Sequence, residues 1–191
     1  MKISMRIATI ASTLLLLTAV TTLAADKPKS GILSERFDDW FYRCVETAPQ
    51  KGKKKSNNRC EVVQIAQTKQ KKKTVNLLTV SLSEMTLGKA KKKKTVMTIL
   101  TPLNVYLPTG MELTVDKGKS VTLQYRNCNN AGCWIQHIID AKTLRALKSG
   151  SAGYAKLRLI NGQNLKIKFS LKGLSAALSS LEAGKKPKQK S

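Results

Sequence analysis

The chain has 191 residues, of which 41% are hydrophobic and 24% are charged. A chain of this length can bury the core of one domain and is short for two. Lysine and arginine number 35 against 11 aspartate and glutamate residues, and the formal net charge is +24 at pH 7. These totals argue against a second domain and favour anionic partners that bind in a salt-dependent manner.

The N-terminal segment has the organisation of a secretory signal peptide. Lys2 and Arg6 precede an apolar run from Ile7 to Leu17, and small residues follow at 21–25. The run is shorter than the roughly 20 residues that span a bilayer, which argues against a retained membrane anchor. We therefore predict a signal peptide over 1–24 and export of the mature chain. Loss of Lys2 and Arg6 lowers the net charge to +22.

Export changes the interpretation of the four cysteines, because thiols in an oxidising compartment usually form disulfides. We favour Cys44 with Cys60 and Cys128 with Cys133, since each pair brackets a polar, turn-like stretch. A zinc site is disfavoured because the spacings do not provide two close pairs of ligands, and the only histidine is His137. A redox-active pair is also disfavoured by the spacing. No cofactor or metal is predicted.

Apolar, strand-forming runs alternate with lysine clusters between residues 37 and 100. We expect strands over 37–44, 60–67, 75–82 and 96–100. In an antiparallel meander, successive turns lie at opposite ends of the sheet. The first and third clusters would then share one end, and the second would lie about 30 Å away at 3.3 Å per residue.

The clusters are the strongest functional signal in the chain. Lysines in turns also keep a protein soluble and protect sheet edges, but three consecutive clusters exceed that need. Basic runs of this kind are typical of polyanion-binding patches. Nucleic acid is not expected as the partner, because an exported protein rarely meets it and aromatic stacking residues are few. The predicted polyanion or cell-surface binding residues are Lys51, Lys53, Lys54, Lys55, Lys69, Lys71, Lys72, Lys73, Lys91, Lys92, Lys93 and Lys94.

The second half of the chain mixes strands with two short helices. Residues 111–116 alternate as an amphipathic strand, and in 121–126 Val121, Leu123 and Tyr125 share one face. Asp140 is placed to cap a helix that ends near Gly150.

Two further strands, 154–160 and 164–171, follow this helix. A three-residue loop over 160–162, with Gly162 in the left-handed conformation, pairs Leu157 with Leu165 and Ala155 with Ile167. A two-residue turn would instead place Leu157 opposite a lysine. Residues 173–181 then have apolar side chains at helical spacing, with Gly184 as the stop.

Together these elements predict an all-β antiparallel β-sandwich of about nine or ten strands, with two short helices and two disulfides. The predicted organisation is a flexible lead-in over 25–36, one domain over 37–184 and a disordered basic tail over 185–191.

Catalytic chemistry is not indicated. Trp40 and Trp134 each lie near a cysteine, as expected for indoles that pack over disulfides in a sandwich core. His137 has no second histidine or free thiol to work with, so we predict a core residue. Asp38 and Asp39 would face opposite sides of a strand and could not act as a pair. We predict that the protein is not an enzyme.

A set of residues spaced between Phe37 and Leu181 covers most of the predicted domain and forms a recognisable pattern. The set includes Asp39, Trp40, Cys44, Cys60, Gln64, Pro102, Leu103, Leu107, Pro108, Gly110, Tyr125, Arg126, Cys128, Gly132, Cys133 and the segment 170–178. In this pattern the chain resembles the invasion-associated locus B protein family of Gram-negative bacteria. The lysine clusters are not part of the shared pattern.

The resemblance implies an exported single-domain β protein associated with entry into host cells, notably erythrocytes. We predict a non-enzymatic virulence-associated protein whose lysine-rich loops bind a host-cell surface or an anionic glycan or lipid. Peripheral association with the bacterial outer membrane is a further expectation, and the predicted location is the periplasm, the outer surface or the medium. The alternative is a structural or protective periplasmic envelope protein without host contact.

Overall fold

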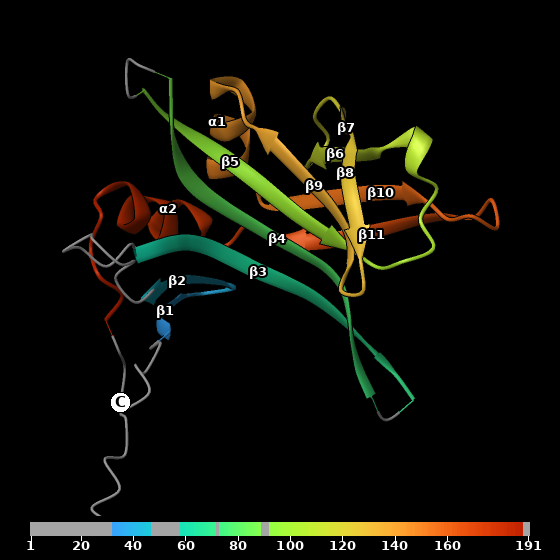
Figure 1. Cartoon of the computed structure of the whole chain (residues 1–191), viewed down its shortest axis with the longest axis horizontal. Helices are drawn as coiled ribbons and strands as arrows, with labels where there is room; N and C mark the ends of the chain where they lie inside the picture. The colour runs from blue at the N-terminus through green and yellow to red at the C-terminus, as the bar shows by residue number, and fades with distance from the viewer. Residues whose placement is uncertain (1–31, 47–57, 72, 89–91, 189–191) are drawn as a thin grey trace, which may run out of the picture.

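The computed structural model describes residues 32–46, 58–71, 73–88 and 92–188 (Figure 1). The predicted signal peptide over 1–24 and the lysines at 51 and 53–55 lie outside these residues. The described strands form two antiparallel sheets, one of seven strands and one of four. The predicted all-β sandwich with two helices is confirmed.

The seven-stranded sheet has the order β1-β2-β3-β4-β5-β9-β8, so its first five strands form a meander along the chain. Its members are β1 (Ile32–Phe37), β2 (Trp40–Glu46), β3 (Asn58–Gln70), β4 (Lys73–Leu87), β5 (Lys92–Thr101), β8 (Tyr125–Asn129) and β9 (Gly132–Ile138).

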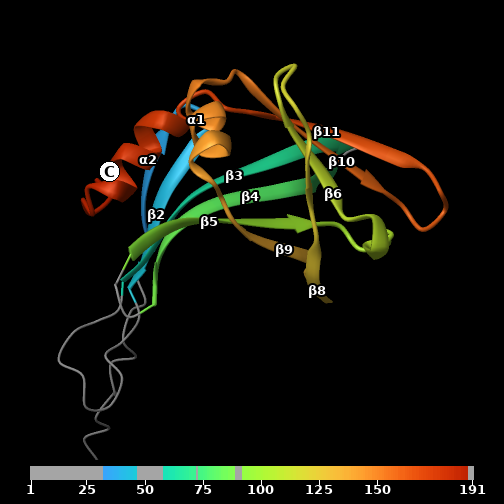
Figure 2. The same cartoon turned by 90° about the horizontal axis from the view of Figure 1, so that it is seen from above.

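The four-stranded sheet has the order β11-β10-β6-β7. Its members are β6 (Met111–Val115), β7 (Val121–Leu123), β10 (Ala152–Arg158) and β11 (Asn164–Ser170), and a short 3-10 helix, η1 (Leu107–Thr109), precedes them. This sheet and the helices α1 (Ala141–Ser149) and α2 (Leu174–Glu182) lie on the same side of the larger, curved sheet (Figure 2).

The core lies between the two sheets and beneath α2. Alternate residues of the strands supply it, as the period of two in a strand requires. Val62, Val80 and Ile99 come from the large sheet, and Leu113 and Leu157 come from the small one. The apolar face of α2 closes the core with the four residues predicted from helical spacing, Leu174, Ala177, Leu178 and Leu181.

Several local predictions are confirmed residue by residue. The β10–β11 register pairs Ala155 with Ile167 and Leu157 with Leu165, and Gly162 has φ +86° in the connecting loop. Asp140 caps α1 by accepting a hydrogen bond from the backbone N–H of Thr143 at 2.7 Å. These features depend on near neighbours in the chain, which is why the sequence patterns predict them.

The predicted strand over 121–126 is wrong, because the chain changes sheets at Gln124. Val121 and Leu123 belong to β7 and pair with β6 in the small sheet, while Tyr125 begins β8 and pairs with β9 in the large sheet. A switch of sheets at one residue leaves the alternation of side chains intact on either side. The pattern alone therefore does not reveal it.

The predicted lead-in is also wrong over residues 32–36, which belong to β1. The turn from β1 to β2 consists of Asp38 and Asp39, with Asp38 at φ +49° and Phe37 paired with Trp40. The two aspartates were expected inside a strand. A short acidic residue tolerates the left-handed conformation that a tight turn needs, and this was the missed signal.

Residues 185–188 were expected to be a disordered tail, and they instead pack on the first two strands. The Tyr42 hydroxyl donates to the carbonyl of Lys185 at 2.6 Å, and the backbone N–H of Lys188 donates to the Glu35 carboxylate at 3.1 Å. Pro187 is buried. These contacts are made across more than 140 positions of sequence, so local composition did not predict them.

Within the described part of the chain, neither helix has the length and apolar character needed to cross a bilayer.

Candidate functional site

The β3–β4 hairpin extends beyond the other strands of its sheet (Figure 1). Residues 67–70 pair with residues 73–76, past the points where β3 leaves β2 and β4 leaves β5. Gln67 donates to the side-chain oxygen of Asn76 at 2.7 Å and ties the two strands together. The exposed lysines of this tip are Lys69, Lys71 and Lys73. The second predicted cluster is thus carried on a projecting arm, and Lys72 lies outside the described residues.

The β4–β5 hairpin carries the third cluster. Residues 84–87 pair with residues 92–95, beyond the ladders with β3 and β9. The Lys93 ammonium lies 2.8 Å from the Glu84 carboxylate. Because that pair partly neutralises itself, the accessible positive charge of the described residues at this tip comes mainly from the exposed Lys92 and Lys94. Lys91 lies outside the described residues.

The two hairpins lie at opposite ends of the sheet, as predicted from the antiparallel meander (Figure 1). The 15 residues of β4 connect them, which corresponds to about 45 Å of strand at 3.3 Å per residue. This is several times the screening length of about 8 Å at physiological salt. Each hairpin therefore acts as a separate positive patch.

The first cluster, Lys51 and Lys53 to Lys55, lies outside the described residues, but the strand ends that flank it are placed. Glu46 at the end of β2 pairs with Asn58 at the start of β3, at the same end of the sheet as the β4–β5 hairpin.

All four cysteines form disulfides in the predicted pairing, Cys44 with Cys60 and Cys128 with Cys133. Each disulfide joins directly opposed residues of two neighbouring strands, β2 with β3 and β8 with β9. Cys44 lies in the core, whereas Cys128 is exposed. The first disulfide anchors both ends of the β2–β3 connection, and the second locks the β8–β9 hairpin.

The prediction that both tryptophans belong to the core is correct for Trp40 and wrong for Trp134. Trp40 is fully buried and donates its indole N–H to the carbonyl of Ser170 at 3.0 Å. On β9, Cys133 and Ile135 point into the core, so Trp134 points to the opposite face, where it is half-buried. The sequence places each indole near a cysteine but does not reveal which face of the sheet the second layer covers.

His137 was predicted to be a core residue, and it is exposed. It lies at the end of β9, close enough to Asp140 for its charge to influence the pKa of that carboxyl. The hydrogen bond from the backbone N–H of Thr143 is the largest cause that lowers the pKa of Asp140 below 3.8. Asp140 thus caps the N-terminus of α1, and His137 lies nearby as an exposed residue of β9.

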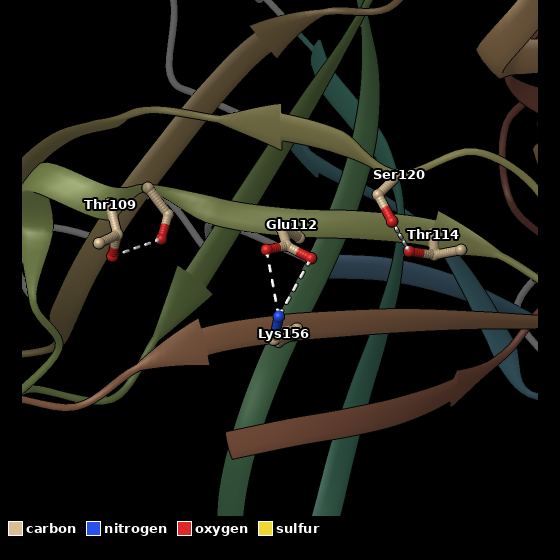
Figure 3. Close-up of polar contacts among 6 residues, drawn as sticks. Thr109, Glu112, Thr114, Ser120 and Lys156 are labelled. Carbon is tan, nitrogen blue, oxygen red and sulfur yellow. Dashed lines mark hydrogen bonds and ion pairs between the residues drawn. The ribbon is translucent and has the colours of Figure 1, made fainter. Parts of the chain in front are cut away.

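The outer face of the small sheet carries a second group of polar contacts (Figure 3). Lys156 on β10 lies across from Glu112 on β6, with its ammonium 3.3 Å from one carboxylate oxygen. Thr114 and Ser120 share a hydrogen bond of 2.7 Å between their hydroxyls. These are cross-strand contacts of exposed groups, and such pairs stabilise a sheet by a few tenths of a kcal/mol, about the value of a surface ion pair.

A shallow hollow of about 200 Å³ lies beside this ion pair, and Arg158 and Asn164 contribute to its wall. Among the described residues, no group of three His, Cys, Asp or Glu side chains could hold a metal ion.

The fold and these surfaces define a class: a disulfide-stabilised β-sandwich with positively charged hairpins that project from the ends of its larger sheet. The model of the invasion associated locus B (IalB) protein family matches residues 40–182. The chain therefore belongs to this family, as the shared residues predicted.

Relatives in the genus Brucella cover almost the full length of the chain. The invasion protein B homologs of Brucella abortus strain 2308 and of Brucella abortus biovar 1 strain 9-941 are each 29% identical over 179 residues. Each match covers 91% of this chain and 94% of the relative.

The fold is also found in a crystal structure of invasion associated protein B from Bartonella henselae. The two structures superpose with a TM-score of 0.63 at 21% sequence identity. The match covers 79% of this chain and 96% of the Bartonella chain. This likeness confirms the architecture.

Proposed function

We propose that this protein is an exported, non-enzymatic virulence factor that promotes association of the bacterium with host cells or their invasion. Membership of the invasion-associated family supports the virulence role. The erythrocyte is the host cell that the family resemblance favours. The proposed binding elements are the lysine-bearing hairpins, and the proposed partner is an anionic glycan or lipid of the host surface.

The observation that carries this proposal is the position of the lysines on projecting hairpins. Lys69 and Lys73 are exposed on strands that no third strand flanks in the described part of the chain, and Lys71 is exposed in the turn between them. An extended tip can approach a large, uneven surface without a clash from the body of the protein. Because the charges sit at the tip, their field acts on the surface within one screening length of about 8 Å.

The two tips are suited to binding in more than one place. They lie at opposite ends of β4, so a broad anionic surface can contact one tip of a given molecule at a time, or bridge two tips of neighbouring molecules. Each exposed ion pair contributes about 0.2–1 kcal/mol, so useful affinity requires several lysines to act together. The clustering of the lysines meets that requirement.

The test replaces Lys69, Lys71 and Lys73 with Gln and measures binding of the purified protein to host cells at several salt concentrations. Loss of three exposed ion pairs should weaken binding about tenfold and flatten its salt dependence. The matched control replaces Lys117, Lys119 and Lys142, which are exposed and lie on neither hairpin. It removes the same charge and should leave binding near the native level. Binding that ignores both salt and the hairpin substitutions would refute the electrostatic mechanism.

Fractionation of intact bacteria tests the host-contact role separately. Accessibility of the protein to a surface-added protease supports it. Confinement to the periplasm would overturn host contact and favour a structural or protective envelope protein.

A further inference from the structure

A surface hollow of about 250 Å³ lies on the face of the large sheet that points away from the core. It extends across β5 and β9 to the edge strand β8. Its wall consists of one aromatic and five polar side chains, none of them a carboxylate. They are Thr98, Arg126, Asn127, Asn129, Trp134 and Gln136. Neither lysine hairpin contributes to it. A half-buried indole surrounded by amides and a guanidinium is an arrangement that solubility does not require.

Local interactions hold the indole in one orientation. The side-chain oxygen of Asn129 accepts a hydrogen bond from the Trp134 indole N–H at 3.2 Å and another from the backbone N–H of Ala131 at 2.9 Å. The disulfide from Cys128 to Cys133 closes the hairpin between them. A platform fixed in this way loses little conformational entropy when a ligand binds.

Gly132 allows this hairpin to lie against the end of β5. A Cβ atom at this position would be 2.2 Å from the carbonyl oxygen of Thr101, and φ is +143°, a conformation that other residues rarely adopt. Any larger residue would push the hairpin, and with it Trp134, away from β5. The glycine is therefore part of what builds the hollow.

The polar rim is arranged around this platform. The Arg126 guanidinium donates a hydrogen bond to the side-chain oxygen of Gln136. A guanidinium has five N–H donors, so this contact orients Arg126 without exhausting its donors. The amide nitrogen of Gln136, the Asn127 amide and the Thr98 hydroxyl add donors and acceptors to the hollow.

We propose that this hollow binds an acidic sugar residue, a pyranose ring that bears a carboxylate. The C–H face of a pyranose is weakly positive and stacks on the negative face of an indole. Its hydroxyls donate and accept hydrogen bonds as amides do, and its carboxylate pairs with the guanidinium of Arg126. The hollow is smaller than the roughly 300–1,000 Å³ of pockets that enclose drug-sized ligands, so it holds one ring.

This site deepens the proposed function and rests on it for the source of the sugar. The lysine hairpins supply attraction to any anionic surface, whereas the hollow selects one chemical group on it. A carboxylated sugar occurs both in host glycans and in bacterial lipopolysaccharide. The binding chemistry is the same for the two sources, and the experiment separates them.

The first experiment follows the two indole N–H signals of ¹⁵N-labelled protein by NMR during titration with methyl glucuronide and, separately, methyl glucoside. These probes differ only at C6, which is a carboxylate in the glucuronide and a hydroxymethyl group in the glucoside. Trp40 is fully buried and serves as the internal reference. The Trp134 signal should move saturably with the glucuronide, with about tenfold weaker binding of the glucoside because one charge-assisted pair is lost. An unmoved Trp134 signal with both probes would overturn the proposal.

Variants assign the roles of the two key side chains. Arg126→Gln should make the two probes bind equally weakly, while Arg145→Gln, an exposed arginine of α1, should leave the preference unchanged. In Trp134→Ala, the backbone amide signals of β8 and β9 should no longer respond to either probe. A glucuronide effect confined to the lysine hairpins would show charge attraction only and refute the site.

The same variants separate this inference from the proposed function. The K69Q/K71Q/K73Q protein should bind the glucuronide normally, because a small probe does not need the hairpin. If the lysine substitutions abolish adhesion but the Trp134 signal does not respond to the glucuronide, only the sugar site is overturned. If the Trp134 signal responds but the lysine substitutions leave adhesion unchanged, only the hairpin mechanism is overturned. Wild-type and R126Q proteins are then compared on immobilised host glycans and on lipopolysaccharide. The surface on which R126Q loses affinity identifies the source of the sugar. If R126Q binds both surfaces as tightly as the wild type, the proposal is refuted.

Discussion

Two regions of this protein share the same ingredients, a disulfide that joins neighbouring strands and a tryptophan close to one of its cysteines. In the first, Trp40 and Cys44 are buried on β2 and belong to the core. In the second, Trp134 follows Cys133 on β9, but the indole lies on the outer face of the sheet and lines a hollow. The first region holds the sandwich together, and the second presents a rigid surface.

The difference follows from spacing along the strand, because β2 and β9 are each next to an edge strand. Trp40 and Cys44 are four residues apart and share one face, whereas Cys133 and Trp134 are adjacent and point to opposite faces. β2 is covered by α2, which packs across the strands at that end. β9 is next to the edge strand β8, and the small sheet covers only its inner face (Figure 2). On β9 the alternation places the cysteine inward and the tryptophan outward. A cysteine and a nearby tryptophan therefore stabilise the core in the first region, and in the second region they place an indole on the surface.

The largest effect expected from this contrast is on stability. Trp40→Ala should lower the free energy of unfolding by about 4 kcal/mol, because it leaves a large cavity in the core. Trp134→Ala should cost about 1 kcal/mol, since the indole is only partly buried. Urea unfolding of both variants measures the difference, and Trp40→Phe provides a milder change if the alanine variant does not fold. Equal losses for the two alanine variants would contradict the assignment of the regions.

The two disulfides should differ less in their contribution to the free energy of unfolding than the two tryptophans do. Replacing Cys44 and Cys60 with Ala removes a cross-link with a sequence separation of 16, worth about 3 kcal/mol by the chain-entropy estimate. The separation between Cys128 and Cys133 is 5, which corresponds to about 2 kcal/mol. The measurement is again urea unfolding.

The effect of the two disulfides on sugar binding should be the opposite of their effect on stability. The C128A/C133A variant should lose the response of Trp134 to methyl glucuronide, whereas C44A/C60A should keep it under conditions where it is folded. Loss of the response in C44A/C60A alone would show that the hairpin disulfide does not preorganise the hollow.

The smallest effect concerns the end of β9, where Asp140 caps α1. Its pKa is lowered below 3.8, mainly by the backbone N–H of Thr143, so the ionised carboxylate is favoured by folding. Its contribution to stability is present above pH 3.8 and is lost as the pH falls through the lowered pKa. Asp140→Asn retains a capping side chain without the charge. The stability difference between wild type and variant should therefore shrink in acid, and urea midpoints from about pH 6 to about pH 2 test this. A stability difference between wild type and Asp140→Asn that does not change with pH would contradict the role of the Asp140 charge in the cap.

Much of the fold was predictable because it depends on local pattern. The loop register beside Gly162 followed from keeping Leu157 opposite an apolar partner, and the buried face of α2 followed from its spacing. The disulfide pairing followed from which cysteines bracket a turn. Each of these depends on a few neighbouring residues, so the information is present in a short segment.

The candidate sites were predictable only in part. The lysine clusters were visible as runs of one residue type, and the meander placed two of them at opposite ends. The ion pair between Glu84 and Lys93 was not visible in the sequence, because the two residues are nine positions apart and meet only across the hairpin. The hollow at Trp134 was also missed, since its wall combines Thr98 of β5 with residues of the β8–β9 hairpin.

The sequence by itself determined the compartment prediction, the strand periods, the pairing of the cysteines and the positions of the lysines. Only the tertiary structure decided which face of each strand is covered, where the chain changes sheets at Gln124, and that Trp40 is buried while Trp134 is accessible. The physical reason is that a period of two divides the side chains of a strand between two faces. Which face becomes the core depends on the element that packs against it, and that element comes from elsewhere in the chain.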